Sequence, residues 1–124
     1  MNDQTTTVAE LAKLIADFVD ERDWNQFHSP KNISMSMAIE AAELMEHFQW
    51  ISMEESREAT EDIEQLTAIG EELADVMCYA LALANQLGID VSDTIDRKMR
   101  KNRIKYPVQD FQGRYGHKHR RDST

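Results

Sequence analysis

Two pairs of acidic residues have the type and spacing that metal-dependent chemistry requires. Glu40 and Glu43 are three residues apart, as are Glu72 and Asp75, and 28 residues separate the two pairs. Residues three apart share one face of an α-helix, and each pair flanks the apolar stripe of its predicted helix. Carboxylates gathered beside a core repel one another and need a partner. Divalent cations bound between the four acids would resolve this repulsion.

The ligand types indicate which metal such a site would hold. Four carboxylates without Cys, and without the Glu-x-x-His spacing of di-iron bundles, form a hard oxygen site that suits Mg²⁺, with Mn²⁺ as a substitute. His47 follows Glu43 by four residues and is interpreted as supporting the site or the core. Mg²⁺ commonly completes its coordination with substrate phosphates, so the acids predict a nucleotide or another phosphate ester. A purely structural acidic bundle explains the same residues about as well.

Four helices are expected to position these acids. Apolar periodicity predicts helices over residues 8–22, 30–51, 61–87 and 92–106. Ser29 and Pro30 have the form of an N-cap and first helical residue, Gly88 closes the third helix, and Ser92 would cap the fourth. Both acid-bearing helices carry apolar residues on more than one face, which indicates covering by a second subunit. The predicted fold is an all-α four-helix bundle completed by dimerisation.

The connector over residues 23–30 gathers Trp24, Phe27 and His28. These side chains could plug the core, which is the simpler interpretation. They could instead form a wall for a flat ligand such as a nucleobase, which stacks on Trp and exchanges hydrogen bonds with His. The sequence alone leaves both interpretations open.

Charge is distributed unevenly along the chain. Its net charge is −9, yet residues 97–124 hold ten Lys or Arg and only two acids. The acidic body disfavours nucleic-acid binding, whereas a basic end facing carboxylates suits a small polyanion held through metal. The first ten residues lack signal-peptide features, the longest apolar run (76–84) is too short to cross a membrane, and Cys78 has no disulfide partner. A cytoplasmic protein without a membrane partner is expected.

Longer motifs extend the pattern of the four acids. The chain resembles the all-α nucleoside triphosphate pyrophosphohydrolases of the MazG type, whose signature is ExxE followed by ExxD, and is most similar to their dCTP pyrophosphatase branch. The likeness covers about residues 8–107 and includes RDWNQFHSPKN, ELMEHFQW, EELADVMCYALALA and KMRKNRIKYP. Residues 1–107 are therefore expected to form the MazG-like domain, and residues 108–124 a polar basic tail.

The resemblance implies roles for individual residues. Metal would bind Glu40, Glu43, Glu72 and Asp75, and the base would lie among Trp24, His28 and Trp50. Phosphate or sugar contacts would come from Tyr79, Lys98, Asn102 and Tyr106, and Lys98 would also stabilise charge on the leaving pyrophosphate. One departure concerns the first helix, where Ile15 replaces a His expected in the family, so the fine substrate preference stays open.

The activity that follows is Mg²⁺-dependent hydrolysis of a deoxynucleoside triphosphate, dCTP or a modified dCTP, to the monophosphate and pyrophosphate in nucleotide-pool sanitation. Two alternatives remain at this point. A related hydrolase could act on dUTP or phosphoribosyl-ATP, and a non-catalytic helical interaction module could carry the acids without turnover. A homodimer, or a homotetramer built as a dimer of dimers, is the expected assembly.

Overall fold

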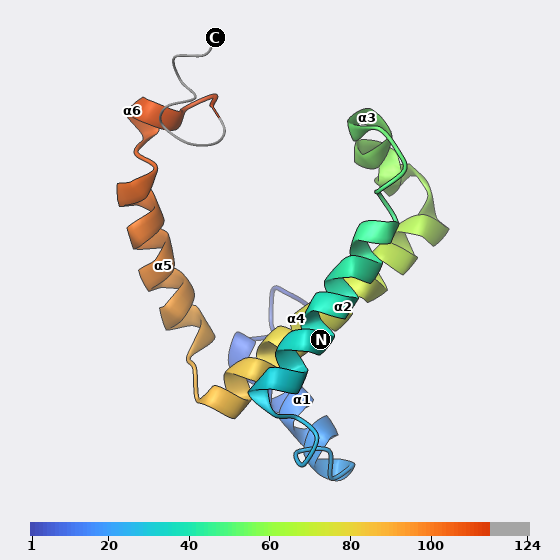
Figure 1. Cartoon of the computed structure of the whole chain (residues 1–124), viewed down its shortest axis with the longest axis vertical. Coiled ribbons are helices and arrows are strands. Elements are labelled where there is room, and N and C mark those ends of the chain that lie inside the picture. Colours follow the sequence, from blue (N-terminus) through green and yellow to red (C-terminus); the bar gives the residue numbers. More distant parts are fainter. Residues whose placement is uncertain (115–124) are drawn as a thin grey trace. The chain divides into compact units, whose positions relative to one another are not determined.

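The computed structural model describes residues 1–114, and the regular structure in that range is entirely helical. The helices are α1 (Val8–Glu21), α2 (Pro30–Glu46), α3 (Met53–Arg57), the 3₁₀ helix η1 (Glu58–Glu61), α4 (Ile63–Leu87), α5 (Val91–Lys105) and α6 (Val108–Phe111) (Figure 1). The chain divides into two compact units, Met1–Ile89 and Asp90–Thr124. Across residues 1–114, none of the helices combines the length and the apolar character that crossing a membrane requires.

Six α-helices rather than the expected four occur in the described part of the chain. The expected helices correspond to α1, α2, α4 and α5, and the short α3 and α6 are additions. Local capping explains α3, because the Glu55 N–H donates to Ser52 Oγ and the Ser52 N–H donates to Glu55 Oε1, at 3.1 and 3.2 Å. In α6, Phe111 packs edge-to-face against Tyr106, with ring centroids 5.2 Å apart. Residues 115–124 of the expected tail lie outside the described residues.

The central helix ends at Glu46 and not at residue 51, so the prediction for its last turn was wrong. The backbone N–H groups of His47 and Phe48 donate to the carbonyls of Leu44 and Met45, three residues back, which tightens the chain into turns. Ser52 is extended, with ψ 167°, where it caps α3. Trp50 consequently does not share a helical face with Glu40 and Glu43.

The other helix ends follow local chemistry. Ser29 accepts a hydrogen bond from the Asn32 N–H with Pro30 as the first residue of α2, as expected. Gly88 adopts a left-handed φ of 65° and ends α4, which was also expected. The fourth long helix begins at Val91 and is capped by Asp90, whose side chain accepts from the Asp93 N–H at 2.8 Å, so the expected cap at Ser92 was wrong.

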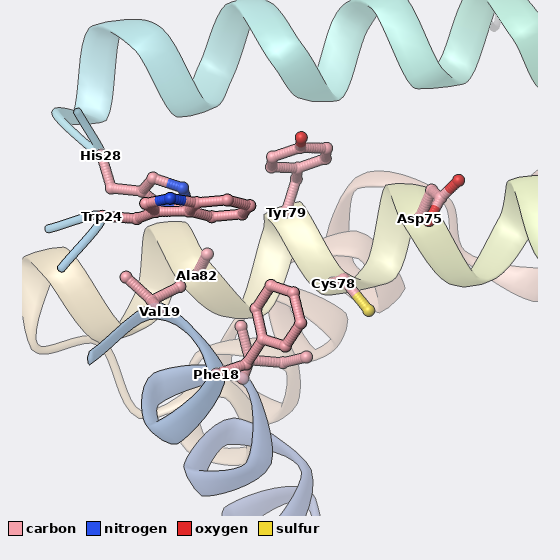
Figure 2. Close-up of a pocket in the computed structure, with 9 residues that line it drawn as sticks. Phe18, Val19, Trp24, His28, Asp75, Cys78, Tyr79 and Ala82 are labelled. Atoms are coloured by element: carbon pink, nitrogen blue, oxygen red, sulfur yellow. The ribbon is translucent and has the colours of Figure 1, made fainter. Parts of the chain in front are cut away.

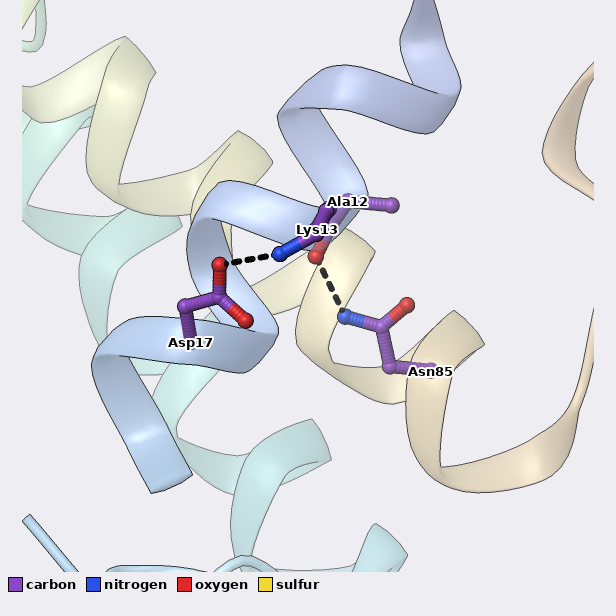
Figure 3. A network of polar contacts seen from close by, with 4 residues as sticks. All are labelled: Ala12, Lys13, Asp17 and Asn85. Atoms are coloured by element: carbon purple, nitrogen blue, oxygen red, sulfur yellow. Dashed lines mark hydrogen bonds and ion pairs between the residues drawn. The ribbon is translucent and has the colours of Figure 1, made fainter. Parts of the chain in front are cut away.

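Within the unit Met1–Ile89, α2 and α4 lie side by side and run antiparallel, and α1 packs against α4 (Figure 1). The buried core is small and consists mainly of Val19, Ile33, Ala82 and Ala84. Asn85 on α4 also donates from Nδ2 to the carbonyl oxygen of Ala12 on α1, at 2.9 Å (Figure 3). This hydrogen bond and the core contacts fix the crossing of α1 over α4, which forms one wall of the site described next.

Large apolar side chains stay exposed along both acid-bearing helices. On α2 they include Met35, Ile39 and Met45, and on α4 they include Leu73 and Met77. The second apolar surface expected for these helices is therefore present. Exposed apolar surface on this scale is typical of interaction sites rather than of solvated monomer faces.

Candidate metal and nucleotide site

An acidic cluster forms where α2 and α4 pack together. Glu40 and Glu43 on α2 and Glu72 on α4 each place a carboxylate oxygen within 4.8 Å of the other two. The helical spacing of three residues puts Glu40 and Glu43 on one face, and antiparallel packing brings Glu72 to that face. Three of the four expected acids thus meet in one group. Asp75 lies outside this group, one turn along α4 from Glu72.

The cluster is under electrostatic stress. The pKa of Glu40 is raised to about 7, first by the side-chain hydrogen bond that Glu40 shares with Glu43. Burial and the charges of Glu43, Asp75 and Glu72 also raise this pKa. Burial raises the pKa of Glu72, as do the charges of Glu43 and Asp75, while His47 opposes the increase. Asp75 therefore acts electrostatically on two members of the cluster. A cation among these oxygens would relieve the repulsion.

The donor set fits a hard divalent cation. Glu40 Oε2 and Glu72 Oε2 are buried and have no hydrogen-bond partner within residues 1–114, although buried polar atoms are normally paired. Glu43 is the exposed member of the three, so solvent or a phosphate can reach the cluster from its side. Carboxylate oxygens with open positions suit Mg²⁺ or Mn²⁺.

An aromatic cavity of about 250 Å³ lies between α1, the connector and α4. We call it the aromatic cavity; Figure 2 shows Trp24, His28 and Tyr79 around it, with Phe18 below them. Trp24 meets Phe18 edge-to-face at 5.6 Å between ring centroids, and stacks on His28 with a tilt of 27°. His28 Nδ1 is buried and has no partner in the described structure. Flat faces and an unpaired ring nitrogen can accommodate a planar heterocycle.

The C-terminus of α1 holds Trp24 in place. The Trp24 N–H donates to the carbonyl of Val19, and the Asp23 N–H donates to that of Asp20, at 3.0 and 3.1 Å. These two bonds form a Schellman motif, with Asp23 in the left-handed position at φ 54°. Asp tolerates that conformation better than most residues do. The reversal turns Trp24 back over α1 and into the cavity.

Asp75 connects the acidic cluster to the aromatic cavity. It lines that cavity together with Cys78 and Tyr79 from the following turn of α4 (Figure 2), and its charge raises the pKa values of Glu40 and Glu72. A ligand with a ring in the cavity could therefore carry its phosphates toward the acids. This is the arrangement that a nucleotide bound through metal requires.

The remaining predicted site residues lie in the turns after α2 or in the second unit. Trp50 is 87% exposed in the turns after α2. Lys98 and Asn102 lie on α5, and Tyr106 ends it, all in the unit that begins at Asp90. Their proposed contacts with phosphate or sugar stay predictions.

Several residues of the cavity were missed by sequence reasoning, which assigned α1 to the core alone. Ile15, Phe18 and Val19 of α1 line the aromatic cavity, with Cys78 and Ala82 opposite on α4. Residues that pack in a core and residues that line a ligand cavity follow the same apolar periodicity, so this pattern could not distinguish the two roles. The signal for a role of α1 in the site was at Ile15, because the resemblance implies a His at that position.

Several known proteins are similar to this chain. The chain is 39% identical over 102 residues to dCTP pyrophosphatase 1 of Mus musculus and 38% identical over the same length to that of Homo sapiens. Each alignment covers 82% of this chain but only 60% of the relative, so the chain spans about 60% of the length of these curated relatives. A crystal structure of a pyrophosphatase from Archaeoglobus fulgidus superposes with a TM-score of 0.74 at 37% identity, covering 86% of this chain and 98% of that one. Residues 35–116 match the MazG-like family, and the chain therefore belongs to the MazG-like family.

Proposed function

We propose that this protein is a metal-dependent nucleoside triphosphate pyrophosphohydrolase that converts dCTP, or a base-modified dCTP, to the monophosphate and pyrophosphate. The observation that carries the proposal is the position of Asp75, which lines a base-sized aromatic cavity and acts electrostatically on a cluster of carboxylates with two unpaired buried oxygens. The similarity to dCTP pyrophosphatase 1 supports the choice of substrate. Removal of dCTP from the nucleotide pool would be the biological role.

In this mechanism Glu40, Glu43, Glu72 and Asp75 would hold Mg²⁺, for which Mn²⁺ could substitute. When bound, the cation would supply the positive charge that polarises the phosphoryl group and favours ionisation of the attacking water. We assign proton acceptance to Glu43, because it is the exposed carboxylate of the cluster and water reaches it directly. The base stacks on Trp24 beside His28 and Tyr79, and Trp50 closes the base site when the complete assembly forms.

Residues of α5 complete the substrate contacts in the proposal. Lys98 stabilises the negative charge that develops on the pyrophosphate, and Asn102 and Tyr106 contact phosphate or sugar. They belong to the basic part of the chain, where ten of the 14 Lys and Arg residues lie. That concentration of positive charge suits a triphosphate.

The proposal includes a dimer. The exposed apolar faces of α2 and α4, and a core with few buried side chains, support packing of these faces against a second copy of the chain, with a tetramer as a pair of dimers. Light scattering at micromolar concentration should give at least twice the mass of the 14.4 kDa chain. A monomer at that concentration would contradict this part of the proposal.

The experiment that tests the activity is pyrophosphate release from a nucleotide panel, with and without Mg²⁺. The panel contains the four canonical deoxynucleotides, 5-substituted dCTP, dUTP and phosphoribosyl-ATP. We expect metal-dependent release that is fastest with dCTP or its 5-substituted forms. Absence of turnover with every compound would indicate a non-catalytic helical module instead.

A further inference from the structure

A second cavity of about 210 Å³ adjoins the aromatic cavity. The two share Ile15, Val19, His28 and Ala82 as walls. Each alone is smaller than the roughly 300 Å³ at which small-molecule sites begin, and together they fall within the usual range. The second cavity differs in its lining, which is rich in polar side chains and is called the polar cavity here: Asp20, Asn25, Asn85 and Gln86.

Three of these polar side chains form a hydrogen-bonded relay with a fixed direction. Asn25 donates from Nδ2 to Asp20 Oδ1, and Gln86 donates from Nε2 to Asn25 Oδ1 at 3.1 Å. A carboxylate can only accept, so Asn25 must turn its NH₂ group toward Asp20 and its oxygen toward Gln86. Gln86 must then offer its NH₂ group to Asn25. The free end of the relay is therefore a hydrogen-bond acceptor, Gln86 Oε1.

Asn85 supplies a second acceptor by the same logic. Its Nδ2 donates to the carbonyl oxygen of Ala12 (Figure 3), which can only accept, so the amide oxygen is left for the polar cavity. Neither Asn85 Oδ1 nor Gln86 Oε1 has a hydrogen-bond partner in residues 1–114. Each NH₂ group keeps a second hydrogen, but a ligand group that faces the two amide oxygens must donate hydrogen bonds. A phosphate is disfavoured as the occupant, because its oxygens would repel these acceptors and the Asp20 carboxylate.

We propose that the polar cavity reads the exocyclic amino group of the nucleobase, and that the Asp20–Asn25–Gln86 relay selects 4-amino over 4-oxo pyrimidines. This inference rests on the proposed function, because it requires the base to occupy the adjoining aromatic cavity. Gln86 contacts the base through Oε1, and Asp20 and Asn25 are positioning residues that set which end of the Gln86 amide faces the ligand. Cytosine presents an NH₂ group at position 4, whereas uracil presents an oxygen there.

The test compares two nucleotides that differ only at position 4. Binding of dCMP and dUMP is measured by isothermal titration calorimetry, alongside kcat/KM for dCTP and dUTP. One hydrogen bond at an open site corresponds to about a tenfold preference for cytosine. Asp20→Asn conserves the shape of the side chain but no longer fixes the direction of the relay, so the preference should fall toward one. Gln86→Ala should have the same effect, mainly by weakening dCMP.

Asp17→Asn is the matched control, because Asp17 lies on the same helix in an exposed ion pair with Lys13 at 2.6 Å (Figure 3) and lines neither cavity. It should keep the wild-type ratio. Ratios are insensitive to the folded fraction, so partial unfolding of a variant cannot mimic the effect. A wild-type protein that binds dCMP and dUMP equally, or variants that keep the full preference, would overturn the inference. Tenfold preference in binding without pyrophosphate release would instead refute the proposed function and leave the relay's role intact.

Discussion

The acidic cluster and the aromatic cavity both include residues of α4, yet they differ in how their side chains interact. The side chains repel one another in the cluster and pack together in the cavity. In the cluster, like charges converge and buried oxygens lack partners, so the protein alone leaves it under stress. In the cavity, Trp24 is held by neighbouring rings and by the Schellman motif at the end of α1, without any ligand. In our proposal the cluster holds an ion and the cavity holds a ring. Substitutions in one region should therefore leave the function of the other intact.

The largest effect is expected from neutralising the cluster. Glu40→Gln or Glu72→Gln should lower kcat by about a thousandfold, because metal-assisted stabilisation of developing charge is worth several kcal/mol. Pyrophosphate release measures the loss. Binding of dCMP should stay within about twofold of wild type, since the ring site is separate. Glu46→Gln, at the end of the same helix and outside the acidic group, serves as control and should retain full activity.

Removing the stacking surface tests the other half of the comparison. Trp24→Ala should raise KM and lower kcat/KM by about ten- to a hundredfold, in line with 1–3 kcal/mol for one base on one aromatic ring. Stabilisation by Mg²⁺ in a thermal shift experiment should be unaffected. If the variant lost its Mg²⁺ response as well, the two regions would not be independent.

The conformation of Asp23 gives a smaller and purely structural prediction. At φ 54°, Asp23→Gly should be tolerated, whereas Asp23→Val should lower the free energy of unfolding by about 1–2 kcal/mol relative to the Gly variant. Urea denaturation provides the measurement. Equal stability of the two variants would mean that the turn before Trp24 is not held in the left-handed region.

The smallest effect concerns pH, because solvent screens the cluster from its exposed side. The pKa of Glu40 is about 7 in the folded chain against 4.5 as its ordinary value, so the folded state holds the extra proton between these pH values. The metal-free protein should accordingly lose stability as pH rises from about 4.5 to about 7. Glu40→Gln should flatten this part of the curve of melting temperature against pH. An unchanged slope would contradict the raised pKa.

Local signals in the sequence were sufficient for much of the fold. Ser29 with Pro30, and Gly88, each act through a few neighbouring residues, so the ends that they mark could be predicted. The end of α2 could not, because the apolar pattern continues to Ile51 although the helix ends at Glu46. Apolar periodicity also cannot decide whether Ser92 or Asp90 caps the fourth long helix, because both residue types are good N-caps.

The candidate site was predictable to a similar extent. Spacing alone identified the acids, since residues three apart along a helix share a face. The contribution of α1 was hidden, because Phe18 and Val19 look the same in a core and in a cavity. The Asp20, Asn25 and Gln86 relay joins residues up to 61 positions apart, and no local pattern indicates such a contact.

One uninterrupted helix of 25 residues, α4, carries Glu72, Asp75, Tyr79 and Gln86. At 1.5 Å per residue, Glu72 and Gln86 are separated by roughly 21 Å along the axis, so the helix sets the distance between the acidic cluster and the polar cavity. Inserting a single residue between Asp75 and Tyr79 would swing everything beyond it by about 100°. The spacing along α4 should consequently be as constrained as the identity of Glu72.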